Sequence, residues 1–103
     1  MTLDELKGSL SNPTPPEDLS GAVVALWHDA RGDWDAAHCV AQDIADDDGS
    51  WVHAYLHRKE GDLSNAAYWS RRAGRPIASD SLAAEWDRIA TALLDGGRQP
   101  CDR

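Results

Sequence analysis

Two stretches of this chain align without gaps and begin 29 positions apart, at residues 27 and 56. They read WHDARGDWDAAHCVAQDIA and LHRKEGDLSNAAYWSRRAG, and each carries Gly-Asp near its middle. A glycine can end one helix in the left-handed conformation, and an aspartate can cap the start of the next helix. A repeat with a period of a few tens of residues is typical of stacked helical hairpins. The repeat therefore predicts an all-α chain built around two helix–turn–helix units.

The rest of the chain also spaces its apolar residues as helices do, and it lacks the two-residue alternation of strands. Thr2 and Glu5 can form a capping box that begins a short first helix. For the second helix, Thr14 is the predicted cap, with Pro15 at the first helical position and Glu17 closing a box. These two caps predict one short helix that begins after Thr2 and a second helix that begins at Pro15.

The later helices follow from similar signals. We expect helices after the caps Asp33 and Asp62, one over about Trp51–Lys59, and a last one on the clearest amphipathic stripe of the chain. Together they make one domain of about six short helices over residues 1–98. Its predicted parts are repeat-like units at about 20–46 and 50–75, a capping helix at about 80–95, and a loose tail at 99–103.

The repeat units also share a pattern of side-chain size. Small residues stand at hairpin-packing positions in both units, and a bulky residue stands beside each turn: Ala25 and Ala54, Ala37 and Ala66, Ile44 and Ala73, then Trp34 and Leu63. This pattern resembles the tetratricopeptide (TPR) class, and the run from Asp62 to Gly74 is similar to the second helix of Sel-one-like repeats. The chain is also similar to small bacterial proteins of this type.

The resemblance covers about residues 20–74 and has consequences for fold and function. It implies a stack of antiparallel helical hairpins that holds another protein in a groove. The chain departs from the family pattern at His28 and His57, where the usual aromatic residue is histidine. Its period is also shorter than the usual 34 residues. The resemblance thus specifies architecture better than it specifies a partner.

Composition narrows the class of partner. The chain has 103 residues and a formal net charge of −8, from 18 acidic and 10 basic residues, which opposes binding to nucleic-acid phosphates. No stretch approaches the roughly 20 apolar residues that span a bilayer, and the first residues lack the pattern of a secretion signal. Cys39 and Cys101 suggest no disulfide framework. We therefore expect a cytoplasmic protein that binds neither nucleic acid nor membrane.

Five positive charges cluster in and after the second unit, against an acidic remainder: Arg58, Lys59, Arg71, Arg72 and Arg75. On a helix, Trp51 and Tyr55 share a face with Arg58, and in stacked hairpins that face commonly lines the groove. Arginine beside aromatic rings can grip an acidic or C-terminal peptide. These seven residues are the predicted partner-binding site. The other interpretation is a solvated face whose cations lie at helix C-termini because the helix dipole favours them there.

Two histidines in the same unit raise the question of a metal. His53 and His57 lie four residues apart on one helix face, and Glu60 lies three residues further on, so the three could chelate zinc. The sequence favours packing instead, because the repeat alignment puts His57 at the position of a packing aromatic. No metal or other cofactor is expected on this basis.

No motif of a catalytic site is recognised in the chain, which leaves catalysis uncertain and less favoured than binding. The predicted function is that of a non-catalytic scaffold that binds a protein or an acidic peptide through a helical-hairpin groove. One alternative is a metal-dependent enzyme or sensor that uses His53 and His57. Another is a homodimer whose groove is its own interface.

Overall fold

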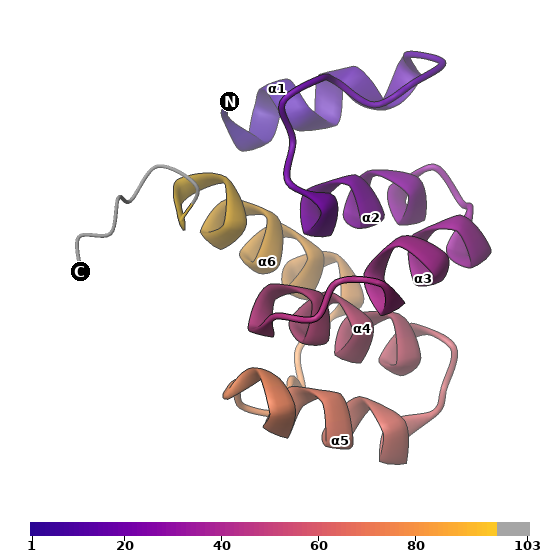
Figure 1. Ribbon diagram of the computed structural model, residues 1–103, viewed down its shortest axis with the longest axis vertical. Helices are drawn as coiled ribbons and strands as arrows, with labels where there is room; N and C mark the ends of the chain where they lie inside the picture. Colours follow the sequence, from indigo (N-terminus) through magenta and orange to yellow (C-terminus); the bar gives the residue numbers. More distant parts are fainter. Residues whose placement is uncertain (97–103) are drawn as a thin grey trace.

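The computed structural model describes residues 1–96, and within this range the chain forms six α-helices and no strand (Figure 1). The helices are α1 (Leu3–Gly8), α2 (Gly21–Ala30), α3 (Trp34–Gln42), α4 (Asp47–Lys59), α5 (Leu63–Ala73) and α6 (Leu82–Gly96), with a 3-10 turn, η1 (Ser9–Ser11), after α1. The all-α prediction is confirmed. The predicted tail at 99–103 lies outside the described residues. None of the helices in the described range is long and apolar enough to cross a bilayer.

The two Gly-Asp turns fold as the repeat predicts. Gly32 and Gly61 adopt φ of 85° and 91°, in the left-handed region that favours glycine. The carboxylate of Asp33 accepts a hydrogen bond from the Ala36 amide at 3.1 Å, and that of Asp62 accepts one from the Asn65 amide at 3.2 Å. These turns join α2 to α3 and α4 to α5, and the two helices of each pair pack on each other.

The start of α2 differs from the prediction. The capping box of Thr14 and Glu17 does not form, and α2 begins six residues after Pro15, at Gly21. Ser20 is the actual cap, because its side chain accepts a hydrogen bond from the Val23 amide. Asp18 has a φ of 71°, which no helix starting at Pro15 could accommodate. By contrast, the predicted capping box at the start of α1 is present.

Helix α4 begins a turn earlier than the expected Trp51. Asp46 caps it by accepting a hydrogen bond from the Gly49 amide at 3.1 Å, and Asp47 and Asp48 occupy its first turn. Negative charge is favourable at a helix N-terminus, so the acidic run initiates α4 instead of forming only a turn before it.

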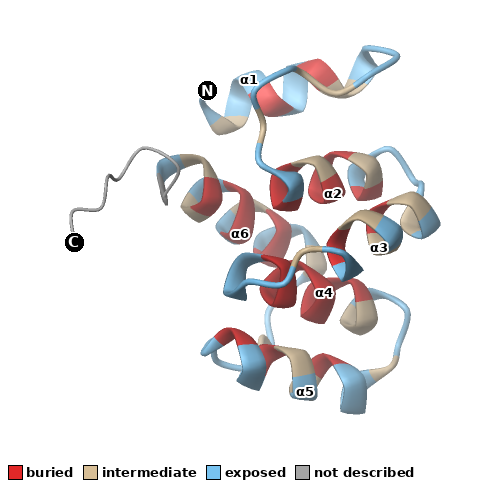
Figure 2. Ribbon diagram, in the orientation of Figure 1, coloured by how far each residue is buried: buried red, intermediate tan, exposed pale blue. Residues whose placement is uncertain are grey.

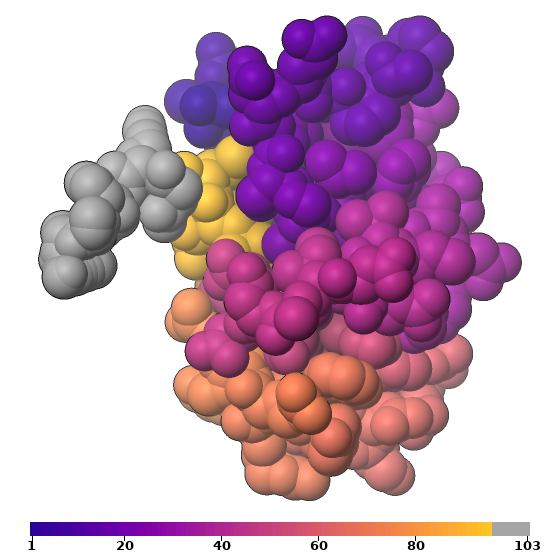
Figure 3. Space-filling model, viewed as in Figure 1, coloured from indigo at the N-terminus to yellow at the C-terminus, as the bar shows by residue number. Residues whose placement is uncertain are grey.

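Helix α6 lies across the face formed by α2 and α4 and also contacts α1 (Figure 1). The indole of Trp86 donates to the carbonyl oxygen of Leu26 at 3.0 Å and ties α6 to α2. Leu26, Leu56 and Ile89 are fully buried where the three helices meet. Figure 2 shows buried residues on each of these helices, and Figure 3 shows α6 only at one edge of the surface in that view. The core therefore depends on α6 as well as on the repeat units.

Candidate functional site

The face that sequence analysis assigned to a groove is covered in the structure. Trp51 and Tyr55 were expected to form an open aromatic floor, but their exposed fractions are 6% and 3%. Helix α6 lies over this face of α4, as its contacts with α2 and α4 show. The two rings therefore belong to the protein interior, and their faces are not accessible to a partner.

Beneath α6, a buried carboxylate connects α2 to α4. Asp29 is 2% exposed, and it accepts hydrogen bonds from the hydroxyl of Tyr55 and from the ammonium of Lys59, both at 2.9 Å. Burial, together with the neighbouring Asp29, raises the pKa of Tyr55, so its phenol stays protonated and donates. Lys59 is thus used to balance an internal charge.

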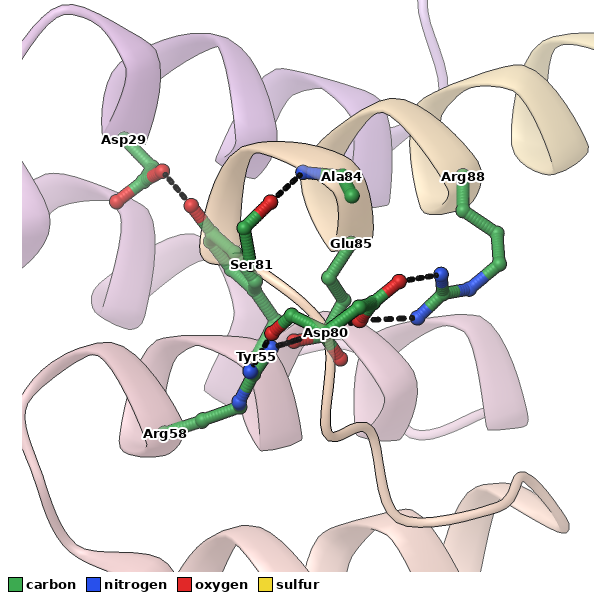
Figure 4. Close-up of polar contacts among 8 residues, drawn as sticks. All are labelled: Asp29, Tyr55, Arg58, Asp80, Ser81, Ala84, Glu85 and Arg88. Atoms are coloured by element: carbon green, nitrogen blue, oxygen red, sulfur yellow. Dashed lines mark hydrogen bonds and ion pairs between the residues drawn. The ribbon is translucent and has the colours of Figure 1, made fainter.

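Arg58 is also used internally. Its guanidinium donates to Oε1 of Glu85, on α6, at 2.7 Å and to the backbone carbonyl of Asp80 (Figure 4). Glu85 is buried, and Arg88 pairs with the Asp80 carboxylate at 2.5 Å. These contacts hold the start of α6 against the end of α4. Arg58 is therefore an anchor for α6.

The other three predicted arginines, Arg71, Arg72 and Arg75, are exposed, and we call them the arginine rim. Within residues 1–96, no carboxylate lies within 4.0 Å of any of their guanidinium groups. Two of them lie over aromatic rings. The Cζ atom of Arg75 is 3.8 Å from the ring centroid of Trp51, and that of Arg72 is 5.2 Å from the Trp69 ring. Cation–π contacts hold these side chains in place without neutralising their charge.

A cleft of about 440 Å³ lies between the α5–α6 connection, α4 and α6. Trp51 and Arg75 form part of its wall. Ile77, which is 60% exposed, also lines it. Its two acidic lining residues are already paired, Glu85 with Arg58 in a buried contact and Asp80 with Arg88 at the surface. The cleft thus offers apolar surface beside Arg75, which has no carboxylate within 4.0 Å among residues 1–96.

A second cluster brings together three histidines. His53 and His57, on α4, lie beside His38, on α3, and their ligand nitrogens all lie within 4.8 Å of one another. The Nε2 atoms of His38 and His53 are 2.9 Å apart. Glu60, the third residue of the sequence hypothesis, contacts Nδ1 of His57 at 2.5 Å. The third imidazole comes from a helix that the hypothesis did not include.

Aromatic stacking positions these imidazoles. Trp34 stacks on His38 with 4.9 Å between ring centroids, and Trp69 stacks on His53 with 4.1 Å. His53 is buried, and burial together with the neighbouring His38 and His57 lowers its pKa to about 4. It therefore stays neutral at physiological pH, with a lone pair on one ring nitrogen.

Sequence analysis missed His38 because nothing in its local sequence marks it. His38 follows Trp34 by one helical turn, and only the packing of α3 on α4 brings it to the other two histidines. The usable signal was the order of the hairpins. A stack places the second helix of one unit next to the first helix of the following unit, so histidines on those two helices are candidates for contact.

Searches with the sequence and the structure matched no protein-family model, no curated protein and no solved structure. The function therefore has to be inferred from the side chains themselves.

Proposed function

We propose that this protein is a non-catalytic interaction module that binds an acidic segment of a protein partner at the arginine rim. The observation that carries the proposal is that Arg71, Arg72 and Arg75 are exposed and have no carboxylate within 4.0 Å among the described residues, on a chain whose net charge is −8. Cations whose only role was to interact favourably with a helix dipole would not need to pack on aromatic rings. Arg72 and Arg75 instead lie over aromatic rings. The TPR-like arrangement and a bacterial, cytoplasmic setting are parts of the same proposal.

The packing of α6 supports one particular location for this binding. Because α6 covers the face of α2 and α4, the partner is expected at the end of α5 and in the cleft beside Arg75. Arginine offers bidentate contacts to carboxylates, and Ile77 with the edge of Trp51 offers apolar area. A segment that mixes acidic and apolar residues matches this surface. Trp51 and Tyr55 would then support the site from below, and Arg58 and Lys59 would hold α4 and α6 in place.

The first prediction tests the rim directly. Replacement of Arg72 or Arg75 by glutamate should weaken binding of a synthetic peptide that alternates glutamate and leucine by about tenfold or more, because each change removes a charge-assisted hydrogen bond and adds repulsion. The readout is fluorescence anisotropy with the labelled peptide at low and at physiological ionic strength. A lysine–leucine peptide is the control of opposite charge, and Arg72→Glu should not weaken its binding.

Lys7→Glu is the matched control. It changes the net charge by the same amount, and it lies on α1, where it pairs with Asp87 at 3.0 Å. Circular dichroism would establish that all variants are equally folded. Equal weakening by Lys7→Glu and Arg72→Glu, or no binding by the unaltered protein, would refute the proposal. If the rim were instead a homodimer interface, Arg72→Glu would lower the mass measured by light scattering and leave peptide binding absent throughout.

A further inference from the structure

The three-histidine cluster shares no residue with the arginine rim, although Trp69 stacks on His53 and also lies under Arg72. His38 comes from the last helix of the first unit, and His53 and His57 come from the first helix of the second. Three imidazoles meeting at a junction of two hairpins need a physical reason. Histidine is a poorer apolar filler than the aromatic residues that usually occupy such positions, because its ring nitrogens need hydrogen-bond partners.

The distances fit a single bound cation. Zinc binds imidazole nitrogen at about 2.0–2.1 Å, so two ligands of a tetrahedral ion lie about 3.4 Å apart. The Nε2 atoms of His38 and His53 are 2.9 Å apart, and all three ligand nitrogens lie within 4.8 Å. A bound ion would replace the present hydrogen bond between His38 and His53 and would move these two nitrogens slightly apart. Three protein ligands leave a fourth position for water or another ligand.

The surroundings fix the ligands as metal sites do. Glu60 accepts a hydrogen bond from Nδ1 of His57, which leaves Nε2 of that ring with its lone pair. A carboxylate behind a histidine in this way makes the imidazole a better ligand. Trp34 and Trp69 stack on the other two rings and restrict their rotation. The side chain of His57 is 12% exposed, so an ion can enter from its side.

We propose that His38, His53 and His57 form a binding site for a first-row divalent transition-metal ion, with Glu60 orienting His57. Imidazole ligands select zinc, copper, nickel and cobalt over magnesium and calcium. The net charge of −8 raises the local concentration of cations near the protein. Because the ligands come from α3 and α4, the ion joins the two hairpins.

The test is a calorimetric titration of chelator-treated, tag-free, full-length protein with Zn²⁺. We expect one tightly bound equivalent per chain, a higher Tm in the presence of Zn²⁺, and no binding of Mg²⁺. His57→Gln should abolish this binding, and Glu60→Gln should weaken it by about 10–100-fold. His28→Gln is the matched control, since His28 occupies the equivalent position in the first repeat unit and lies outside the cluster; it should bind as the unaltered protein does.

Cobalt identifies the ligands. Co²⁺ bound by three imidazoles and water gives visible d–d bands without the near-ultraviolet charge-transfer band of a thiolate. That thiolate band would assign the ion to a cysteine, either Cys39, which is exposed next to His38, or Cys101, and would overturn the proposal. The absence of Zn²⁺ binding, or binding that His57→Gln leaves unchanged, would overturn it equally. Circular dichroism of each variant separates loss of a ligand from loss of the fold.

Discussion

At the scale of single residues, the interior of this protein is organised around polar groups that each have a partner. Within residues 1–96, no buried side-chain nitrogen or oxygen lacks a hydrogen bond. Asp29 shows what this requires, because a carboxylate that is 2% exposed needs both Tyr55 and Lys59 to replace its hydration. Removing one partner from such a group costs more than the contact itself, since the remaining charge stays buried.

Lys59→Met should therefore lower the free energy of unfolding by about 1–3 kcal/mol, because it leaves Asp29 charged beneath α6 with only Tyr55 as a partner. Urea denaturation followed by circular dichroism measures the change. Adding Asp29→Asn to this variant should restore part of the loss, since the unbalanced charge is then gone.

Lys7→Met is the comparison for this prediction. It breaks the pair with Asp87, in which both side chains are almost half exposed, and should cost no more than about 1 kcal/mol. If the two lysine variants lost the same amount of stability, Lys59 would not be compensating a buried charge.

At the scale of helices, local side-chain chemistry determines where a helix begins and ends, but it does not determine which other helices that helix packs against. The Gly-Asp turns were predictable because a left-handed residue and a capping carboxylate act within a few positions of each other. Thr14 and Pro15 are equally good local signals for a helix start. The positive φ of Asp18 nevertheless interrupts the helical backbone, and Ser20 is the residue that caps α2. The amphipathic stripe on α6 indicated a buried face, but the residues of α6 alone do not show that this face packs on α2 and α4. For the same reason, no local pattern predicted the burial of Trp51, and only the order of the hairpins pointed to the approach of His38 to His53.

Two glycines near helix ends make a matched pair. A Cβ atom on Gly49 would lie 2.4 Å from the backbone oxygen of Ile44, whereas a Cβ on Gly8 would meet nothing within 4 Å. Gly49→Ala should therefore destabilise the protein by about 1–3 kcal/mol, because the backbone before α4 must move.

Gly8→Ala should leave stability unchanged or raise it by up to about 1 kcal/mol, since alanine favours the helical backbone that Gly8 already adopts. Thermal unfolding of the two variants under one set of conditions compares them. A gain in stability for Gly49→Ala would mean that the close approach of Ile44 does not restrict the start of α4.

At the scale of the whole molecule, α6 turns two repeat units into a protein with a common core. It contributes Trp86, Ile89, Ala90 and Leu93 to the buried cluster, and its start is held by Arg58. Lys7 and Asp87 also connect α6 to α1, so the first and last helices of the described chain meet. Loss of α6 packing should consequently destabilise the entire structure.

Trp86→Ala should lower stability by about 3–5 kcal/mol, because it empties a buried site and leaves the Leu26 carbonyl without its donor. For a domain of this size, each kcal/mol corresponds to about 4–8 °C in Tm, so calorimetry should show a large shift. The stability of Trp86→Phe should fall between those of Trp86→Ala and the unaltered protein. Ile77→Ala, at an exposed position, should stay within about 0.5 kcal/mol of the unaltered protein. A small, similar shift for Trp86→Ala and Ile77→Ala would mean that α6 is only loosely attached.

The contact between Trp86 and Leu26 also has a consequence for the order of events during synthesis. It joins residues 60 positions apart, whereas the helix pairs on either side of each Gly-Asp turn are neighbours in sequence. Local contacts form first, and N-terminal segments leave the ribosome first. The nascent chain therefore presents an uncovered apolar face on α2 and α4 until α6 has been translated. During that interval, a chaperone has its best opportunity to engage this chain.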